Sequence, residues 1–349
     1  MQGRSSRSST GRRRRVAGVL SAAALVLGLA GAAPAGADPQ PTHPAGAAYV
    51  DHIDKFDDRR WDLHVYSPSM DRVIPLQVIR PADTSAPRPT LYLLNGAGGG
   101  EDGANWLNQT DLLGFLADKN ANVVIPAEGM FSYYTDWMQD DPVIGRNKWT
   151  TFLTRELPPV IDAALDTTAV NSIAGLSMAA TSVLDLAIEA PDLYRGVASY
   201  SGCAQTSDPL GQAYVRSVIE VMGETDARNM WGPYDGPGWR AHDPLLNAEG
   251  LRGLSLYIAN GNGLPGPYEN PALPRTPQSP PLPDQVVIGG TIESATNICT
   301  HRLAERLHEL NIPATFDFRD NGTHSWGYWQ DDLRASWPQL SASLGLIPE

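Results

Sequence analysis

The residues Gly175-Leu-Ser-Met-Ala179 form a pattern that suits nucleophilic chemistry. β-branched and apolar residues run into this pentapeptide, and helix-forming residues follow it from 180 to 190. A strand, a tight turn and a helix in this order are typical of a nucleophile elbow, which holds a serine at the tip of a strained turn. The sequence therefore predicts Ser177 as a nucleophile, although Ala179 stands where the usual G-x-S-x-G motif has glycine. The alternative is a serine that only caps an ordinary helix.

A nucleophilic serine needs a base, and His324 has the right place in the chain. It lies in Asn321-Gly-Thr-His-Ser-Trp326, directly after an apolar stretch at 314–318 that we expect to be the last strand. In nucleophile-elbow enzymes the acid and then the histidine follow the serine, and the histidine belongs to a loop after the last strand. We interpret the other histidines after Ser177 as structural or exposed; they are His242, His301 and His308.

The acid that would orient His324 is less clearly marked. Glu269, Asp284 and Glu293 are the candidates that precede it. Glu293 opens an expected helix, where packing can hold a carboxylate rigidly, as an imidazolium requires. We therefore prefer Glu293, with Glu269 and Asp284 as alternatives in Pro-rich chain. A first-turn acid that only interacts with the helix dipole is the competing interpretation of Glu293.

Two backbone amides would have to face the developing oxyanion. The residue after the nucleophile, Met178, supplies one, and the turn Asn95-Gly-Ala-Gly-Gly-Gly100 supplies the other at Gly96 or Ala97. Such a donor contributes about 2.7 to 4 kcal/mol to transition-state stabilisation. The glycine run does not match a phosphate-binding P-loop, because no lysine follows it.

Alternating strands and helices must position these residues. This order favours an α/β fold, a mostly parallel central sheet with helices on both faces, that opens with an antiparallel strand pair. We find no repeat and no second domain in 38–349, and we expect Pro158 and Pro159 to bend their helix. The expected strands are 61–65, 73–80, 90–94, 122–126, 196–200, 254–259 and 314–318, and the expected helices are 106–118, 149–165, 180–190, 210–222, 292–310 and one from about 328.

Two stretches do not fit the alternation. Residues 261–290 are dense in proline and glycine and too long for an ordinary connection, so they form either a flap over a site or a loose insertion. Residues 222–243 contain Trp231 and Trp239 and either line a groove or form a surface loop with packed tryptophans.

The N-terminus predicts export. Four arginines at 12–15 precede an apolar run at 16–33 and the small residues Ala35-Gly-Ala37, which together are typical of a secretory signal peptide, residues 1–37, cleaved after Ala37. The apolar run is short of the roughly 20 residues that span a membrane. Without the six arginines of this segment, 20 basic residues remain against 39 acidic ones, a net charge of −19. So acidic a chain repels phosphate backbones, which excludes nucleic acid as a partner.

The two cysteines, Cys203 and Cys299, are expected to form a disulfide, since exported chains usually pair their cysteines. Two buried thiols are the alternative. The histidines show no close-spaced ligand pattern in the sequence, so we expect neither a metal nor another cofactor.

The chain resembles the secreted mycolyltransferases of the antigen 85 family, which are esterase-like enzymes. The resemblance covers nearly all of 38–349, with the motifs in family order. The motifs are Val65-Tyr-Ser-Pro-Ser-Met70, Leu91-Tyr-Leu-Leu-Asn-Gly96, Ser132-Tyr-Tyr-Thr-Asp-Trp137, Lys148-Trp-Thr-Thr-Phe-Leu-Thr-Arg-Glu-Leu-Pro158, Ala174-Gly-Leu-Ser-Met-Ala179, Gly261-Asn-Gly263, and Asn321-Gly-Thr-His-Ser-Trp326 with Tyr328-Trp329.

The resemblance implies an α/β-hydrolase fold and a ping-pong transfer of a long acyl group from a trehalose ester to a sugar hydroxyl in the cell envelope. It implies a glycolipid donor and a sugar acceptor as partners, and we expect a monomer. The roles that it implies are nucleophile for Ser177, base for His324, acid for Glu293, oxyanion amides for Ala97 and Met178, and site lining for Trp326.

Three departures set this chain apart from the mycobacterial enzymes. Asn95 stands where they carry a trehalose-holding aspartate, and Gly98 replaces a nearby arginine, so the substrate-binding positions Asn95 and Gly98 predict an altered sugar shell. Ala259 replaces a cysteine near their active site. A secreted carboxylesterase with the same three residues is therefore an alternative function, and a non-catalytic envelope-binding protein is a further one.

Overall fold

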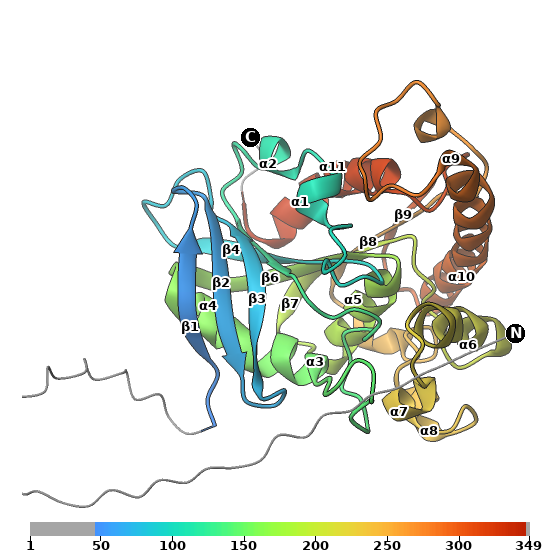
Figure 1. Cartoon of the computed structure of the whole chain (residues 1–349), viewed down its shortest axis with the longest axis horizontal. Helices are drawn as coiled ribbons and strands as arrows, with labels where there is room; N and C mark the ends of the chain where they lie inside the picture. The colour runs from blue at the N-terminus through green and yellow to red at the C-terminus, as the bar shows by residue number, and fades with distance from the viewer. Residues whose placement is uncertain (1–45, 347–349) are drawn as a thin grey trace, which may run out of the picture. The chain divides into compact units, whose positions relative to one another are not determined.

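The computed structural model describes residues 46–346, so the expected signal peptide lies outside the described residues. A nine-stranded mixed sheet runs through this part of the chain (Figure 1). Its strands are β1 (Tyr49–Lys55), β2 (Arg60–Ser67), β3 (Arg72–Ile79), β4 (Arg88–Leu94), β5 (Asn122–Pro126), β6 (Thr167–Leu176), β7 (Tyr194–Tyr200), β8 (Ser255–Asn260) and β9 (Thr315–Phe318).

The strand order is β1-β2-β3-β5-β4-β6-β7-β8-β9. β1, β2 and β3 pair antiparallel, and β3 is also antiparallel to β5. All pairs from β5 to β9 are parallel, which confirms the mostly parallel sheet and the antiparallel opening. Because the parallel strands end at the same edge, the turns after β4, β6, β7 and β8 come together there.

The central strands are buried on both faces. In β4, Tyr92 and Leu94 pack into one hydrophobic cluster, while Leu91 and Leu93 pack into the other. This period-two division explains why the strand is continuously apolar. In Figure 1 the helices α1, α2 and α11 lie above the sheet, and α3, α5 and α6 lie below it.

Most of the helices agree with the expected ranges, and several contain irregular turns. The range 149–165 contains a π-helical turn (Phe152–Glu156), and Pro158 and Pro159 follow it at the start of α4. The irregularity therefore precedes the prolines. The helices are α1 (Trp106–Gln109), α2 (Leu112–Phe115), α3 (Trp149–Thr151), α4 (Leu157–Leu165), α5 (Met178–Glu189), α6 (Pro209–Arg216), α7 (Ala227–Trp231), α8 (Pro237–Ala241), α9 (Leu282–Asp284), α10 (Gly290–Glu309) and α11 (Trp326–Ser343).

Two regions differ from the sequence-based prediction, and a third settles a choice that the sequence left open. β1 was not predicted, because its sequence Tyr-Val-Asp-His-Ile-Asp-Lys has no apolar run. The expected helix 106–118 is two short helices, separated by the extended residue Thr110. Residues 222–243 contain the unpredicted short helices α7 and α8, and Trp231 and Trp239 are buried and pack against each other, as the packed-tryptophan alternative expected. Among residues 46–346, no helix is long and apolar enough to cross a membrane.

Candidate active site

Ser177 lies at the sharp turn between β6 and α5. Its backbone has φ 56° and ψ −121°, a combination that L residues adopt only when the surroundings enforce it. Its N–H donates to the carbonyl of Tyr200 at 2.9 Å, which ties the turn to the end of the neighbouring strand β7. The strand-turn-helix arrangement predicted for Ser177 is therefore present, with the hydroxyl on a strained turn.

Ala179 is accommodated because the residue opposite it is a glycine. A Cβ atom at Gly175 would lie 2.9 Å from the Cβ of Ala179, which is too close for any side chain. The close approach of strand and helix that a nucleophile elbow needs thus depends here on Gly175. This explains why the motif tolerates alanine at its last position.

The structure brings Ser177, His324 and Glu293 together. His324 Nε2 lies 2.7 Å from Ser177 Oγ, and His324 Nδ1 lies 2.8 Å from Glu293 Oε2. These lengths are those of hydrogen bonds. Ser177 is 8% exposed and Glu293 is fully buried, so the hydrogen-bonded series runs from a partly accessible hydroxyl to a carboxylate shielded from solvent.

The second carboxylate oxygen of Glu293 is held by groups from two strand ends. Glu293 Oε1 accepts from the Gly261 N–H at 2.7 Å, from Ser201 Oγ at 2.8 Å and from Asn260 Nδ2 at 3.0 Å. Arg319 donates to the same oxygen at 3.4 Å. With Oε1 so fully engaged, Oε2 has a fixed direction toward the imidazole. This rigid anchoring favours Glu293 as the residue that orients His324.

Arg319 also pairs with a second buried carboxylate, Asp332. Burial raises the pKa of Asp332 to about 7, against the opposing effect of the Arg319 charge. Asp332 and Glu293 therefore share one guanidinium beside the imidazole. The sequence analysis missed this pair, because Asp332 lies inside a helix with no motif around it.

Glu269, an alternative acid in the sequence analysis, has a different set of partners. Its Oε1 accepts from Thr323 Oγ1 at 2.5 Å and from Gln285 Nε2 at 2.7 Å. Its Oε2 accepts from Tyr328 OH at 2.6 Å and from the Gly266 N–H at 2.7 Å. Burial by itself raises the pKa of Glu269, but these hydrogen bonds outweigh it and bring the pKa below the ordinary 4.5. Glu269 thus forms a hydrogen bond with Thr323, the residue before His324, and not with the imidazole.

Backbone hydrogen bonds also join the Pro-rich stretch to the His324 loop. The Gly263 N–H donates to the Gly322 carbonyl at 2.9 Å, and the Gly322 N–H donates to the Leu264 carbonyl at 2.8 Å. The His324 N–H donates to the Gly289 carbonyl at 3.2 Å. The stretch 261–290 therefore frames the loop that carries His324. Asp284, the third acid candidate, is exposed in α9.

The two expected oxyanion amides lie on either side of the nucleophile. Met178 is the first residue of α5, so its N–H has no partner within the helix. The turn at 95–100 packs against the elbow, because a Cβ atom at Gly96 would lie 3.5 Å from the Cβ of Ser177. The Ala97 carbonyl accepts from Phe131, while no hydrogen bond from the Ala97 N–H is found within residues 46–346.

Asn95 is fully buried, and its side-chain amide joins the turn to the end of β5 and the start of α1. Asn95 Nδ2 donates to the Pro126 carbonyl at 3.0 Å, and Oδ1 accepts from the Trp106 N–H at 3.3 Å. We therefore assign Asn95 to holding the turn. At Gly98 a Cβ atom would lie 2.4 Å from an Asp102 carboxylate oxygen, so a larger residue there requires Asp102 to move.

A cavity of about 420 Å³ opens beside the imidazole. His324, Trp326 and Trp329 form one wall, and residues of the Pro-rich stretch, among them Arg275 and Gln285, form another. The expected site-lining residue Trp326 therefore shares a cavity with His324. The combination of aromatic faces with amide and guanidinium donors is typical of pockets that orient a polar ligand.

The disulfide predicted for Cys203 and Cys299 is present, with the two Cα atoms 5.0 Å apart. It joins the segment after β7 to helix α10. Ser201 belongs to the first of these segments and Glu293 to the second, so the cross-link connects the two pieces of chain that meet at the carboxylate. By the chain-entropy estimate a loop of this length stabilises the fold by about 4 to 5 kcal/mol.

Sequence reasoning missed four groups near the nucleophile. Three of them contact Glu293: Ser201, Asn260 and Arg319. The first two could have been predicted from the sequence, because they lie at the carboxyl ends of parallel strands. The fourth is Tyr214 of α6. Burial raises the pKa of its phenol, and a hydrogen bond with Ser177 partly offsets this.

The other histidines after Ser177 are engaged elsewhere. His242 Nδ1 lies 2.9 Å from Asp185 Oδ2, and its ring stacks on Trp231. His301 stacks on Phe318, and His308 is exposed on α10. None of the three contacts Ser177 in the described part of the chain, as the sequence analysis expected.

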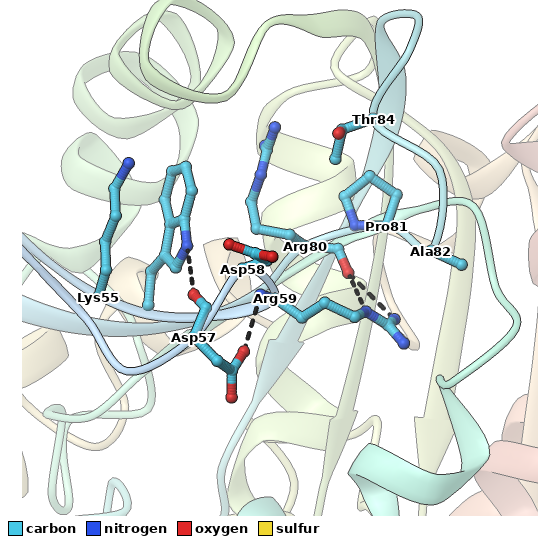
Figure 2. A pocket seen from close by; sticks show the side chains of 9 residues that line it. Lys55, Asp57, Asp58, Arg59, Arg80, Pro81, Ala82 and Thr84 are labelled. Atoms are coloured by element: carbon cyan, nitrogen blue, oxygen red, sulfur yellow. Dashed lines mark hydrogen bonds between the residues drawn. The ribbon is translucent and has the colours of Figure 1, made fainter.

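A second and larger pocket, of about 640 Å³, lies at the turn between β1 and β2 (Figure 2). Two of its charged residues are engaged with neighbouring groups: Arg59 donates to the Arg80 carbonyl, and Asp57 accepts from the Arg59 N–H at 2.8 Å. It contains none of the residues around Ser177. We therefore place the candidate active site at the smaller cavity beside His324.

Comparison with known proteins identifies the family of the chain. A family model described as putative esterase matches residues 67–340. The diacylglycerol acyltransferase/mycolyltransferase Ag85A of Mycobacterium tuberculosis is 34% identical over 351 residues, 97% of this chain and 94% of that protein. The diacylglycerol acyltransferase/mycolyltransferase Ag85B of Mycolicibacterium smegmatis is 32% identical, over 81% of this chain and 85% of that protein.

Solved structures share the fold at lower identity. The crystal structure of Mycobacterium tuberculosis MPT51 (FbpC1) has a TM-score of 0.68 at 24% identity, and it covers 82% of this chain and 100% of that one. An S-formylglutathione hydrolase from Agrobacterium tumefaciens has a TM-score of 0.60 at 15% identity, over 85% of this chain and 100% of that one. The fold is that of the α/β-hydrolases, and the chain belongs to the esterase family that includes the Ag85 acyltransferases.

Proposed function

We propose that the protein is a secreted serine acyltransferase that moves a mycolyl or similar long acyl group between trehalose esters and sugar hydroxyls of the cell envelope. The observation that carries the proposal is the hydrogen-bonded series from Ser177 Oγ through His324 to Glu293. The names of the Ag85 relatives support acyl transfer as the reaction. The expected signal peptide supports export, and the expected monomer stays a prediction.

In the first half-reaction Ser177 Oγ attacks the carbonyl carbon of the donor ester while His324 Nε2 takes the hydroxyl proton. Glu293 stabilises the imidazolium and keeps its ring in place. The Ala97 and Met178 amides are proposed to receive the carbonyl oxygen as it becomes negative. The tetrahedral intermediate collapses when the C–O bond to the donor sugar breaks and His324 returns the proton to that oxygen, which leaves an acyl-serine.

In the second half-reaction a sugar hydroxyl gives its proton to His324 Nε2 and attacks the acyl-serine. The bond to Ser177 Oγ breaks and the serine takes the proton back. The choice between sugar and water depends on how well the cavity excludes water and holds the acceptor. The cavity beside His324, with Trp326 in its wall, is the proposed acceptor space.

A carboxylesterase is the second candidate function, and a specific observation favours it. Asn95 is buried within its turn and Gly98 has no side chain, so neither offers a polar group to a sugar. The non-catalytic alternative is disfavoured, because a binding protein has no need for a serine, a histidine and a glutamate at hydrogen-bonding distances.

The test has two stages. Labelling by a serine-directed phosphonate should be complete in the wild-type protein and absent in Ser177→Ala; persistent labelling would refute the nucleophile. Incubation with a trehalose monoester should then give diester and free trehalose. Predominantly free acid would establish the esterase instead, and an unlabelled wild-type protein would establish the non-catalytic alternative.

A further inference from the structure

The antiparallel ribbon of β1 and β2 carries a cluster of potential metal ligands outside the candidate active site. His52 and Asp54 are two residues apart in β1, so their side chains lie on the same face of the strand. His64 of β2 is the direct cross-strand partner of His52. The two imidazoles and the carboxylate therefore share one face of the ribbon.

The donor atoms of this cluster lie within 4.8 Å of one another. Nε2 of His52 lies 3.8 Å from Asp54 Oδ2, and Nε2 of His64 lies 3.7 Å from the same oxygen. The two rings stack at a centroid separation of 3.9 Å. Tetrahedral ligands at about 2.0 to 2.1 Å from a zinc ion are about 3.3 to 3.4 Å apart. The two N–O distances are close to that spacing, but the ring planes are only 10° apart, so both imidazoles must turn out of the stack before their Nε2 lone pairs can face one ion.

A second carboxylate prepares one of the imidazoles for this role. Asp51 Oδ2 lies 2.8 Å from His52 Nδ1, which favours the tautomer with hydrogen on Nδ1 and a free lone pair on Nε2. A carboxylate behind a ligating histidine is the usual outer partner in zinc sites. The ladder shifts register between Val50 and His52, so Asp51 sits at a bulge, a device that re-aims side chains.

We propose that His52, Asp54 and His64 form a surface site for Zn²⁺, with Asp51 as the outer partner of His52 and the fourth position open to water. Two imidazole nitrogens and one carboxylate oxygen suit zinc better than Mg²⁺ or Ca²⁺, which prefer oxygen ligands. A second histidine-containing cluster among residues 46–346, formed by Asp185, Glu189 and His242, offers one imidazole only.

The bound ion would pin β1, the edge strand, to the rest of the sheet. β1 pairs with β2 alone, and edge strands are the part of a sheet that opens most readily. A zinc ion bound by residues of both strands would stabilise the paired state by mass action. The formal net charge of −13 also favours the approach of a cation.

The test is titration of the untagged full chain with Zn²⁺ by calorimetry, in a buffer that does not chelate metal. We expect one ion per chain and a rise in the thermal unfolding temperature. His52→Gln, His64→Gln and Asp54→Asn should each weaken binding more than about tenfold, and Asp51→Asn about 10-fold to 100-fold. His308→Gln, which removes an exposed histidine of α10, should bind as the wild type does.

Phosphonate labelling of Ser177 gives an independent check that each variant is folded, since none of these residues touches the active site. Co²⁺ added in place of Zn²⁺ should give visible absorption bands of a low-coordinate imidazole complex in the wild type and not in His64→Gln. Failure of the wild type to bind one Zn²⁺, or equal affinity of the wild type and a folded His64→Gln, would overturn the proposal.

Discussion

Two buried glutamates approach the loop of His324 from different regions, and they act on different parts of it. Glu293, in the first turn of α10, contacts the imidazole ring at 2.8 Å. Glu269, in the Pro-rich stretch, contacts the side chain of Thr323, one residue earlier, at 2.5 Å. Each carboxylate is saturated with hydrogen bonds, yet only one of them faces a group that changes charge during the proposed reaction.

The two glutamates therefore have different effects on His324: Glu293 acts on the charge of the imidazole, and Glu269 acts on the position of the loop. Glu293 is held by strand ends and a helix, which are rigid, and it can stabilise the charged imidazolium. Glu269 lies in a short 3-10 turn of the Pro-rich stretch (Pro267–Glu269), and its carboxylate adds side-chain hydrogen bonds to the backbone hydrogen bonds that join this stretch to the His324 loop. An irregular segment can therefore hold a neighbouring loop in a fixed position when several of its groups donate hydrogen bonds to one buried carboxylate.

The largest effect is expected for Glu293→Gln. The amide cannot stabilise the imidazolium and favours the wrong tautomer, so turnover of a reporter ester should fall by about 10³-fold to 10⁴-fold with the fold intact. Steady-state kinetics with circular dichroism as the fold control measure this. Unchanged turnover would move the acid role away from Glu293.

A smaller loss is expected for Glu269→Gln. The variant keeps Glu293 as the partner of the His324 imidazole but weakens the contacts that hold the His324 loop. Displacement of a base by about 1 Å lowers the rate by up to about 100-fold. We expect kcat to fall by about 10-fold to 100-fold and phosphonate labelling to slow in parallel. A loss as large as that of Glu293→Gln would erase the distinction between the two carboxylates.

Stability in acid gives a second measure of the same residue. Because the pKa of Glu269 is below 4.5 in the folded chain, the ionised group stabilises the fold above pH 4.5, and this contribution is lost as the pH falls through the folded-state pKa. Urea unfolding at a series of acidic pH values should show the gap between wild type and Glu269→Gln narrowing below pH 4.5. A gap that stays constant with pH would show that the charge of Glu269 is not the stabilising element.

The smallest effect is expected for Asp284→Asn, the matched control for both variants. Asp284 is exposed, so the turnover and the unfolding free energy of the variant should stay within experimental error of the wild-type values. A clear loss of turnover would reveal a role that the contacts of α9 do not suggest.

Much of this arrangement could be predicted from the sequence, because it follows from local patterns. The elbow around Ser177 joins an apolar strand to a helix, and the position of His324 follows from chain order. The continuous apolar strands β4 and β5 predicted a sheet covered on both faces. The choice of Glu293 over Glu269 rested on its position in a helix, and the hydrogen bond to His324 supports it.

The rest depends on contacts between residues far apart in the sequence. The hydrogen bond of Glu269 with Thr323 spans 54 positions, and that of Ser201 with Glu293 spans 92. β1 lacks an apolar run, since its outer face is polar and it covers only the edge of the sheet. No periodicity reports such features, because they arise only when the strands are assembled.

The backbone of Ser177 implies that this protein gives up thermostability for its chemistry. A residue with φ 56° and ψ −121° is strained by about 1 to 3 kcal/mol, and glycine alone escapes that penalty. Ser177→Gly should therefore melt at a higher temperature than Ser177→Ala, although both variants lose the hydroxyl. If so, the protein's most robust form is one that cannot react.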